Sequence, residues 1–153
     1  FQPVAGTNYG AKQYDRTIKL TKVFVLSAIA LSLCFFLPIQ IIPDKILSLF
    51  ISDATIVSSG VNNFRLMFST YSALAIFIMI VTLFQSLGKA SKASILVMLR
   101  QILLFIPAVI LFPMLANLGE TGVWLAIAVV DGFAGILCLF MMLKEFRKLR
   151  SLA

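Results

Sequence analysis

The sequence predicts an all-α membrane protein, a polytopic helical bundle with four full transmembrane helices. The end of a preceding helix and a short interfacial helix accompany them. Two observations predict this class. The 153 residues are 61% hydrophobic but only 12% charged, whereas soluble domains average about 25% charged residues. Charge is also almost absent from four long stretches: 23–42, 66–88, 101–119 and 121–143.

Each of these stretches is long enough to cross a bilayer. A span needs roughly 20 apolar residues at a helical rise of about 1.5 Å. Helices are expected because backbone polar groups in lipid must be satisfied within the segment. We therefore expect one domain over 1–153, with a basic cytoplasmic tail over 144–153 and transmembrane helices over 17–42, 54–87, 93–116 and 121–143.

The chain begins with residues that loosen a helix. Pro3, Gly6 and Gly10 stand among polar residues in the first 11 positions. Proline removes a helical hydrogen bond and glycine adds backbone freedom. Residues 1–11 are therefore expected to be the end of a preceding kinked helix, with a terminal loop as the alternative.

Proline and aspartate mark further local features. Proline is tolerated at the first position of a helix, so Pro43–Ile51 is expected to be a short interfacial helix with its apolar face on lipid. Asp53 is a candidate N-cap for the next helix. Pro107 and Pro113 lie six residues apart in the third span, which should bend there.

The basic residues gather on one side of the predicted bundle. Because the number of spans is even, both ends of the chain lie on the same side of the membrane. Lys45 and Arg65 lie on the opposite side, and Arg100 sits a little inside the third span. The shared side is expected to be cytoplasmic in an inner or plasma membrane. Basic residues at span ends, without interleaved aromatics, argue against a nucleic-acid partner. The side with the excess carries Lys12, Arg16, Lys19, Lys22, Lys89, Lys92, Lys144, Arg147, Lys148 and Arg150.

Other chemistries find little support in the residue types present. The two cysteines, Cys34 and Cys138, lie inside the first and last spans, and the chain has no histidine. This pattern suggests neither a disulfide framework nor a metal site. With no nucleophile–base pair either, we expect no enzyme activity and no cofactor.

Four sequence motifs, within 2–11, 84–89, 99–107 and 122–131, stand out together. They resemble motifs of the MATE transporters, the multidrug and toxic compound extrusion family. The opening FQPVAGTNYGAKQYDR resembles the end of that family's eighth helix, through Gln2-Pro3, Gly6, Asn8 and Gly10-Ala11. Phe84–Lys89 resembles the exit of the tenth helix, and Leu99-Arg100-Gln101 with Pro107 resembles the eleventh. Gly122-Val123-Trp124 with Asp131 resembles the start and middle of the twelfth.

The resemblance implies a fold and a function. Members have twelve helices in two six-helix lobes, so this chain would hold the end of the eighth helix and helices nine to twelve. It would be part of the C-terminal lobe, and its partners would include an N-terminal lobe of the same protein. Members are antiporters, so it would export cationic or amphipathic organic compounds by alternating access, in exchange for protons or sodium ions.

Several residues are candidates for the substrate path. Polar side chains at membrane depth are costly and mark functional positions, and methionine offers an adaptable surface. The alternative for this group is ordinary helix packing. The candidates are Gln2, Asn8, Met67, Thr70, Tyr71 and Gln85.

Asp131 is the sharpest signal because it is the only charge in 121–143. Insertion scales give such a residue a cost of roughly 2.5–3.5 kcal/mol. It is either a proton or cation site or a structural carboxylate that pairs with Arg100, and we favour the structural role. Many bacterial members carry a coupling carboxylate in the tenth helix, but 66–87 contains no Asp or Glu. The essential acid is therefore expected in the N-terminal lobe or the seventh helix, which leaves H⁺ and Na⁺ open.

Two alternative functions remain. A lipid-linked oligosaccharide flippase of the same superfamily would typically show more arginine at mid-membrane. Arg65 and Arg100, placed near span ends, argue against it. A non-transporting structural membrane subunit is disfavoured by the kinked first segment and by the buried Asp131.

Overall fold

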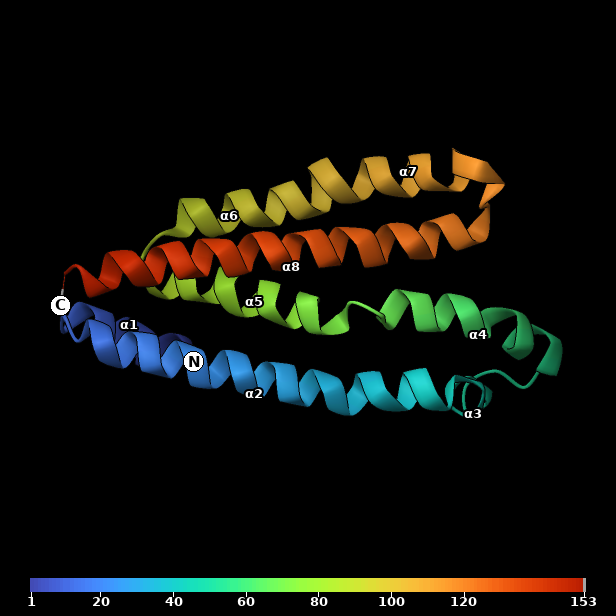
Figure 1. Cartoon of the computed structure of the whole chain (residues 1–153), viewed down its shortest axis with the longest axis horizontal. Helices are drawn as coiled ribbons and strands as arrows, with labels where there is room; N and C mark the ends of the chain where they lie inside the picture. Colours follow the sequence, from blue (N-terminus) through green and yellow to red (C-terminus); the bar gives the residue numbers. More distant parts are fainter. Residues whose placement is uncertain (153) are drawn as a thin grey trace.

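The computed structural model describes residues 1–152, apart from the side chain of Ala116, and every regular element in that range is a helix. The helices lie side by side along one long axis (Figure 1). In chain order they are α1 (Gln2–Gly10), α2 (Tyr14–Ile41), α3 (Pro43–Ser48), α4 (Ala54–Phe68), α5 (Tyr71–Ser86), α6 (Ala90–Met98), the π-helix η1 (Leu99–Phe105), α7 (Ile106–Met114), the 3₁₀ turn η2 (Leu115–Asn117) and α8 (Glu120–Arg150).

Four helical runs are long and apolar enough to cross a membrane, which confirms the predicted fold class. The last run extends beyond the predicted span, because α8 continues through the basic segment as far as Arg150. The runs are Tyr14–Ile41, Ala54–Ser86, Ala90–Met114 and Glu120–Arg150.

The last helix is the centre of the bundle. In the most apolar 18-residue segment of α8, 44% of the residues are buried, whereas in the corresponding segment of the third span only 6% are buried. Figure 1 shows α8 lying between the α6–α7 span and α5. Small residues make this position possible, because they let helix backbones approach closely in a membrane. A Cβ built on Gly135 would lie only 2.7 Å from the Cβ of Ala73 in α5.

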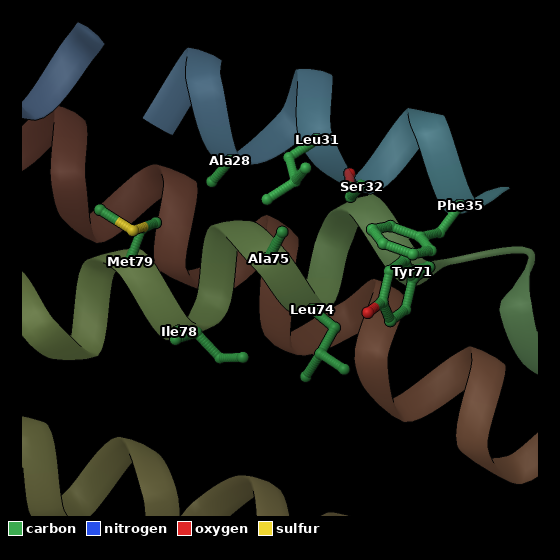
Figure 2. Close-up of a pocket in the computed structure, with 9 residues that line it drawn as sticks. All are labelled: Ala28, Leu31, Ser32, Phe35, Tyr71, Leu74, Ala75, Ile78 and Met79. Carbon is green, nitrogen blue, oxygen red and sulfur yellow. The ribbon is translucent and has the colours of Figure 1, made fainter. Parts of the chain in front are cut away.

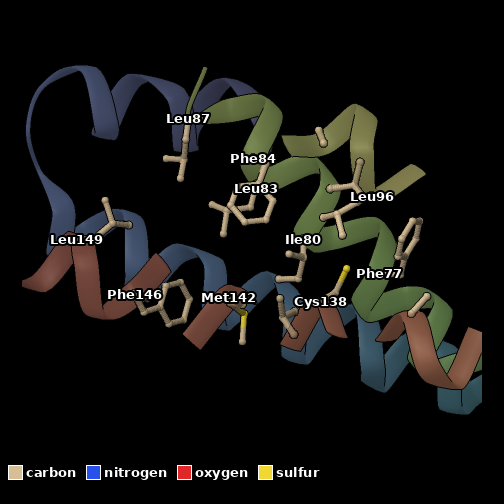
Figure 3. Close-up of a cluster of buried hydrophobic side chains, with 14 of the residues drawn as sticks. Phe77, Ile80, Leu83, Phe84, Leu87, Leu96, Cys138, Met142, Phe146 and Leu149 are labelled. Carbon is tan, nitrogen blue, oxygen red and sulfur yellow. The ribbon is translucent and has the colours of Figure 1, made fainter. Parts of the chain in front are cut away.

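The apolar core is concentrated at the end of the bundle that holds the C-terminal part of α8. Figure 3 shows α5 and α8 facing each other there, with Leu96 of α6 packed against them. Ile80, Leu83 and Phe84 from α5 are 1% exposed or less. Cys138, Met142, Phe146 and Leu149 of α8 complete this cluster. The packing fixes the second, third and last spans against one another at this end.

The second span is divided within the bundle, although the sequence predicted one helix over 54–87. α4 ends at Phe68 and α5 begins at Tyr71. Hydroxyl side chains at the division donate to backbone carbonyl groups, which gives the backbone an alternative to the regular hydrogen bonds of a helix. Ser69 Oγ donates to the carbonyl of Leu66 at 2.7 Å, and Thr70 Oγ1 donates to the carbonyl of Ala128 in α8 at 3.0 Å. The division is thus tied to the central helix.

The third span contains a π-helical segment, Leu99–Phe105, immediately before Pro107. Such widened turns are rare and occur frequently at functional sites. Pro107 lies in the first turn of α7 and Pro113 in its last turn. Pro3 lies in the first turn of α1, where a missing N–H interrupts no bond of that helix. The kink roles expected for these three prolines stay predictions.

At the opposite end of the bundle, α3 and α4 follow the predicted local signals. Pro43 begins α3, which ends at Ser48 and not at the predicted Ile51. Phe50 beyond it is 83% exposed. Asp53 is the N-cap of α4, as predicted, because its Oδ1 accepts from the backbone N–H groups of Thr55 at 2.8 Å and Ile56 at 3.4 Å. These two hydrogen bonds, to Thr55 foremost, hold the pKa of Asp53 below its usual range.

Candidate functional site

Asp131 forms an ion pair with Arg100 between α8 and η1. Arg100 Nε donates to Asp131 Oδ1 at 2.9 Å, and Arg100 Nη2 donates to the same oxygen at 2.5 Å. Asp131 is 5% exposed. The guanidinium also lies over the ring of Phe77 in α5, with Cζ 5.4 Å from the ring centroid. One arginine therefore connects the second, third and last spans.

This geometry supplies a partner for the aspartate that the sequence singled out. A buried charge must be paired and hydrogen-bonded, and the forked guanidinium meets that need by two donors to one oxygen. The pairing favours the structural interpretation of Asp131, whereas its alternative role as a cation site stays a prediction. Arg100 was expected near a span end, but it lies near the middle of the run Ala90–Met114, and Asp131 balances its charge.

A second buried carboxylate, Glu145, was missed by the sequence analysis. It is 4% exposed and forms a salt bridge with Lys89 at the turn before α6. Lys92 Nζ lies 3.7 Å from the other carboxylate oxygen. The available signal was that Glu145 is the only acidic residue in the basic segment 144–150. α8 is thus linked to the start of the third span at one end by Glu145 and near the middle by Asp131.

The substrate-path candidates do not form one cluster. Gln2 Nε2 of α1 donates to Gln85 Oε1 of α5 at 3.1 Å, so the structure brings these two together. Asn8 Nδ2 donates to the carbonyl of Val4 within its own helix. Thr70 and Tyr71 lie at the division of the second span, and Met67 lies half-buried in the last turns of α4.

A groove of about 240 Å³ lies between α2 and α5 (Figure 2). Tyr71 is the one substrate-path candidate among its lining residues, and Met79 lies at the other end. The lining is uncharged and largely apolar, with Ser32 bonded to Ser72 at 2.9 Å through their hydroxyls. Sequence reasoning missed the α2 side of this groove, because apolar residues of a span carry no mark of which neighbour they face. The lining comprises Ala28, Leu31, Ser32, Phe35, Tyr71, Leu74, Ala75, Ile78 and Met79.

Within residues 1–152, no three Asp, Glu, Cys or His side chains gather closely enough to hold a metal ion. Cys34 and Cys138 are free thiols on different helices. The arrangement supplies instead an interhelical groove, two buried ion pairs and two irregular spans.

Comparisons with known proteins agree with this architecture. The model of the MatE family matches residues 1–111. An inward-facing multidrug resistance MATE family transporter of the MOP superfamily has 20% identity and a TM-score of 0.87, over 98% of this chain and 35% of that one. A MATE in complex with MaL6 has 20% identity and a TM-score of 0.88, over 97% and 34%. A structure described as protein A has 31% identity and a TM-score of 0.83, over 94% and 32%.

The structural likeness at 20% identity shows the fold, and the chain spans about a third of the length of those proteins. A sequence search of curated proteins found no match. The family model provides the stronger statement, because it matches well over half of the chain, from the first residue to within α7. The MatE family is a family of membrane transporters and not of enzymes, and this chain belongs to it.

Proposed function

We propose that the chain is part of the C-terminal lobe of a multidrug efflux antiporter. The observation that carries the proposal is the MatE match, together with a fold that follows MATE transporters over nearly the whole chain. The protein exports cationic or amphipathic organic compounds while protons or sodium ions flow inward. The transport cavity forms between two lobes, and the N-terminal lobe is the partner of this chain.

The groove between α2 and α5 suits the apolar part of such a compound. Its lining is uncharged and includes two aromatic rings, those of Phe35 and Tyr71. Met79 adds a flexible, polarisable surface of the kind that promiscuous binding sites use. Tyr71 also begins α5 just after the division of the second span, so movement of α4 relative to α5 would change this end of the groove.

Coupling to the cation belongs to a group other than Asp131. The carboxylate of Asp131 is already bonded twice by Arg100, and α5 contains no acidic residue. The coupling acid is therefore assigned to the N-terminal lobe or the seventh helix. An oligosaccharide flippase would typically show more arginine at mid-membrane, whereas the charge of Arg100 is balanced here by Asp131.

Efflux of a cationic aromatic dye by the intact protein, in a bacterium that lacks its own pumps, tests this function. We expect energy-dependent efflux that Tyr71→Ala changes severalfold per molecule of inserted protein, because the variant removes a ring from the groove. Phe50→Ala is the matched control, because Phe50 is an exposed aromatic residue beyond α3 that does not line the groove. Residues 1–153 alone should give no efflux. An intact protein that exports no dye under any ion gradient would refute the proposal.

A further inference from the structure

An exposed side of the third span carries an apolar groove distinct from the one described above. It lies between α6, the start of η1 and α8, and has a volume of about 270 Å³. Ile95 in its lining is 63% exposed and the neighbouring Met98 is 58% exposed, so this side of the span is not covered by the other described helices. We call it the α6–α8 groove; its lining is Lys92, Ile95, Leu96, Leu99, Leu137 and Met141.

A cation stands at one end of this otherwise apolar groove. Lys92 is in the first turn of α6, and its side chain is 52% exposed. Glu145 does not neutralise it, because Lys89 forms the close salt bridge with that carboxylate while Lys92 Nζ stays 3.7 Å away. Two lysines share one carboxylate, which leaves one positive charge at the groove.

Further positive charge lies on α8, on the stripe of that helix that carries the lining residues Leu137 and Met141. Residues seven apart on a helix share a face. Lys144 follows Leu137 by seven residues and Lys148 follows Met141 by seven, and both lysines are exposed. The basic end of the groove therefore lies at the end of the bundle where the positive charge of the whole chain accumulates.

The apolar part has the length of one acyl chain. A second hollow, of about 300 Å³, shares Ile95 and Leu99 with the groove and continues along η1 to Leu103. From Lys92 to Leu103 the helix rises about 16 Å. One leaflet of a bilayer has a hydrocarbon depth of about 15 Å. A chain whose headgroup lies at Lys92 would thus follow the third span to the middle of the membrane.

We propose that the α6–α8 groove binds an anionic phospholipid of the cytoplasmic leaflet. The phosphate pairs with Lys92, supported by Lys144 and Lys148, and one acyl chain lies along Ile95 and Leu99 between the third and last spans. Charge complementarity selects the headgroup, and the apolar lining holds the chain. The bound lipid fills the space between the third and last spans on the stretch between the Glu145 salt bridge and the Arg100–Asp131 pair.

Native mass spectrometry of the intact protein tests the proposal, after exchange into phosphatidylglycerol or phosphatidylcholine with identical acyl chains. We expect about fivefold more phosphatidylglycerol to be retained, and Lys92→Gln should remove that preference. Lys22→Gln is the control, because Lys22 is an exposed lysine at the same end on α2. Equal retention of the two lipids, or an unchanged preference in Lys92→Gln, would overturn the proposal.

A second pair of variants tests the acyl chain. Ile95→Trp fills the groove and should lower retention of phosphatidylglycerol severalfold, whereas Val97→Trp, on an exposed part of the same helix outside the groove, should not. Inorganic phosphate at millimolar concentration should fail to displace the lipid. Displacement by phosphate would show a simple anion site. Equal effects of the two tryptophans would show that the groove does not hold the acyl chain. Either result would refute the proposal. These readouts are independent of transport.

Discussion

Asp131 of α8 accepts two hydrogen bonds from Arg100 of the third span through a single oxygen, at 2.5 and 2.9 Å. The arginine comes from the π-helix η1, and its guanidinium lies over Phe77 of α5. A widened turn and a buried ion pair therefore coincide in the middle of the third span. This relationship sets the expected behaviour of variants at Asp131.

Replacing Asp131 should weaken the fold more than it weakens coupling. Removal of one partner from a buried pair costs about 3–5 kcal/mol, because the other charge is left uncompensated. Asp131→Asn keeps one acceptor for Arg100 and should be milder than Asp131→Leu. The double variant Arg100→Met with Asp131→Leu should recover much of the loss. Thermal unfolding and the yield of inserted protein measure this.

The controls for Asp131 separate structure from coupling. Asp44→Asn, at an exposed carboxylate of α3, should leave yield and unfolding unchanged. Dye efflux per molecule of inserted Asp131→Asn should persist across external pH. Normal protein levels with efflux abolished at every pH would instead assign Asp131 to the coupling site.

Gly135 should tolerate no larger side chain. A Cβ there would lie 2.7 Å from the Cβ of Ala73 and 2.8 Å from its carbonyl oxygen, so Gly135→Ala should separate α5 from α8 at a cost of about 1–3 kcal/mol. Gly60→Ala is the matched control. Its Cβ would meet only Leu47 Cδ1 at 3.8 Å, and alanine in a helix gains about 0.5–1 kcal/mol over glycine. Thermal unfolding in detergent should show opposite shifts, and equal shifts would contradict this account of the contact.

Thr70→Val should loosen the division of the second span. The variant keeps the shape of the side chain but removes the hydrogen bond to the carbonyl of Ala128. Interhelical bonds of this kind contribute about 0.6 kcal/mol on average, and at most about 1.7. Thr82→Val removes only a bond within α5, to Ile78, and should cost less. Hydrogen exchange at the Ser69–Thr70 division should rise in Thr70→Val alone, and protection that stays unchanged would sink the idea.

The orientation in the membrane is open to a labelling test. We expect the α5–α6 turn to be cytoplasmic, because the basic residues gather there, and the α7–α8 connection to be external. In a Cys34→Ala background, an impermeant thiol reagent on intact cells should label Leu118→Cys and leave Ala90→Cys unlabelled. Cys138 can remain because it is fully buried. Labelling at position 90 and none at position 118 would reverse the topology.

Local signals in the sequence determined the class of the protein and several of its details. Four stretches that are almost free of charge give four helical runs, because a bilayer core disfavours charge and leaves backbone groups only their own helix to bond. Asp53 caps α4 as predicted, since its two donors lie two and three residues away along the chain. Asp131 was identified as unusual because a charge at membrane depth is costly whatever its neighbours are.

Only the tertiary structure decided what these residues contact. Arg100 is 31 residues from Asp131 in sequence, and Glu145 is 56 residues from Lys89, so no periodicity connects them. The division at Ser69–Thr70 and the close approach of Gly135 to Ala73 depend on α8 lying against α5. Most faces of the spans are apolar whether they meet lipid or protein, because both neighbours favour the same side chains. Hydrophobic pattern therefore fixes which segments cross the membrane, while close packing and interhelical polar pairs decide which faces meet.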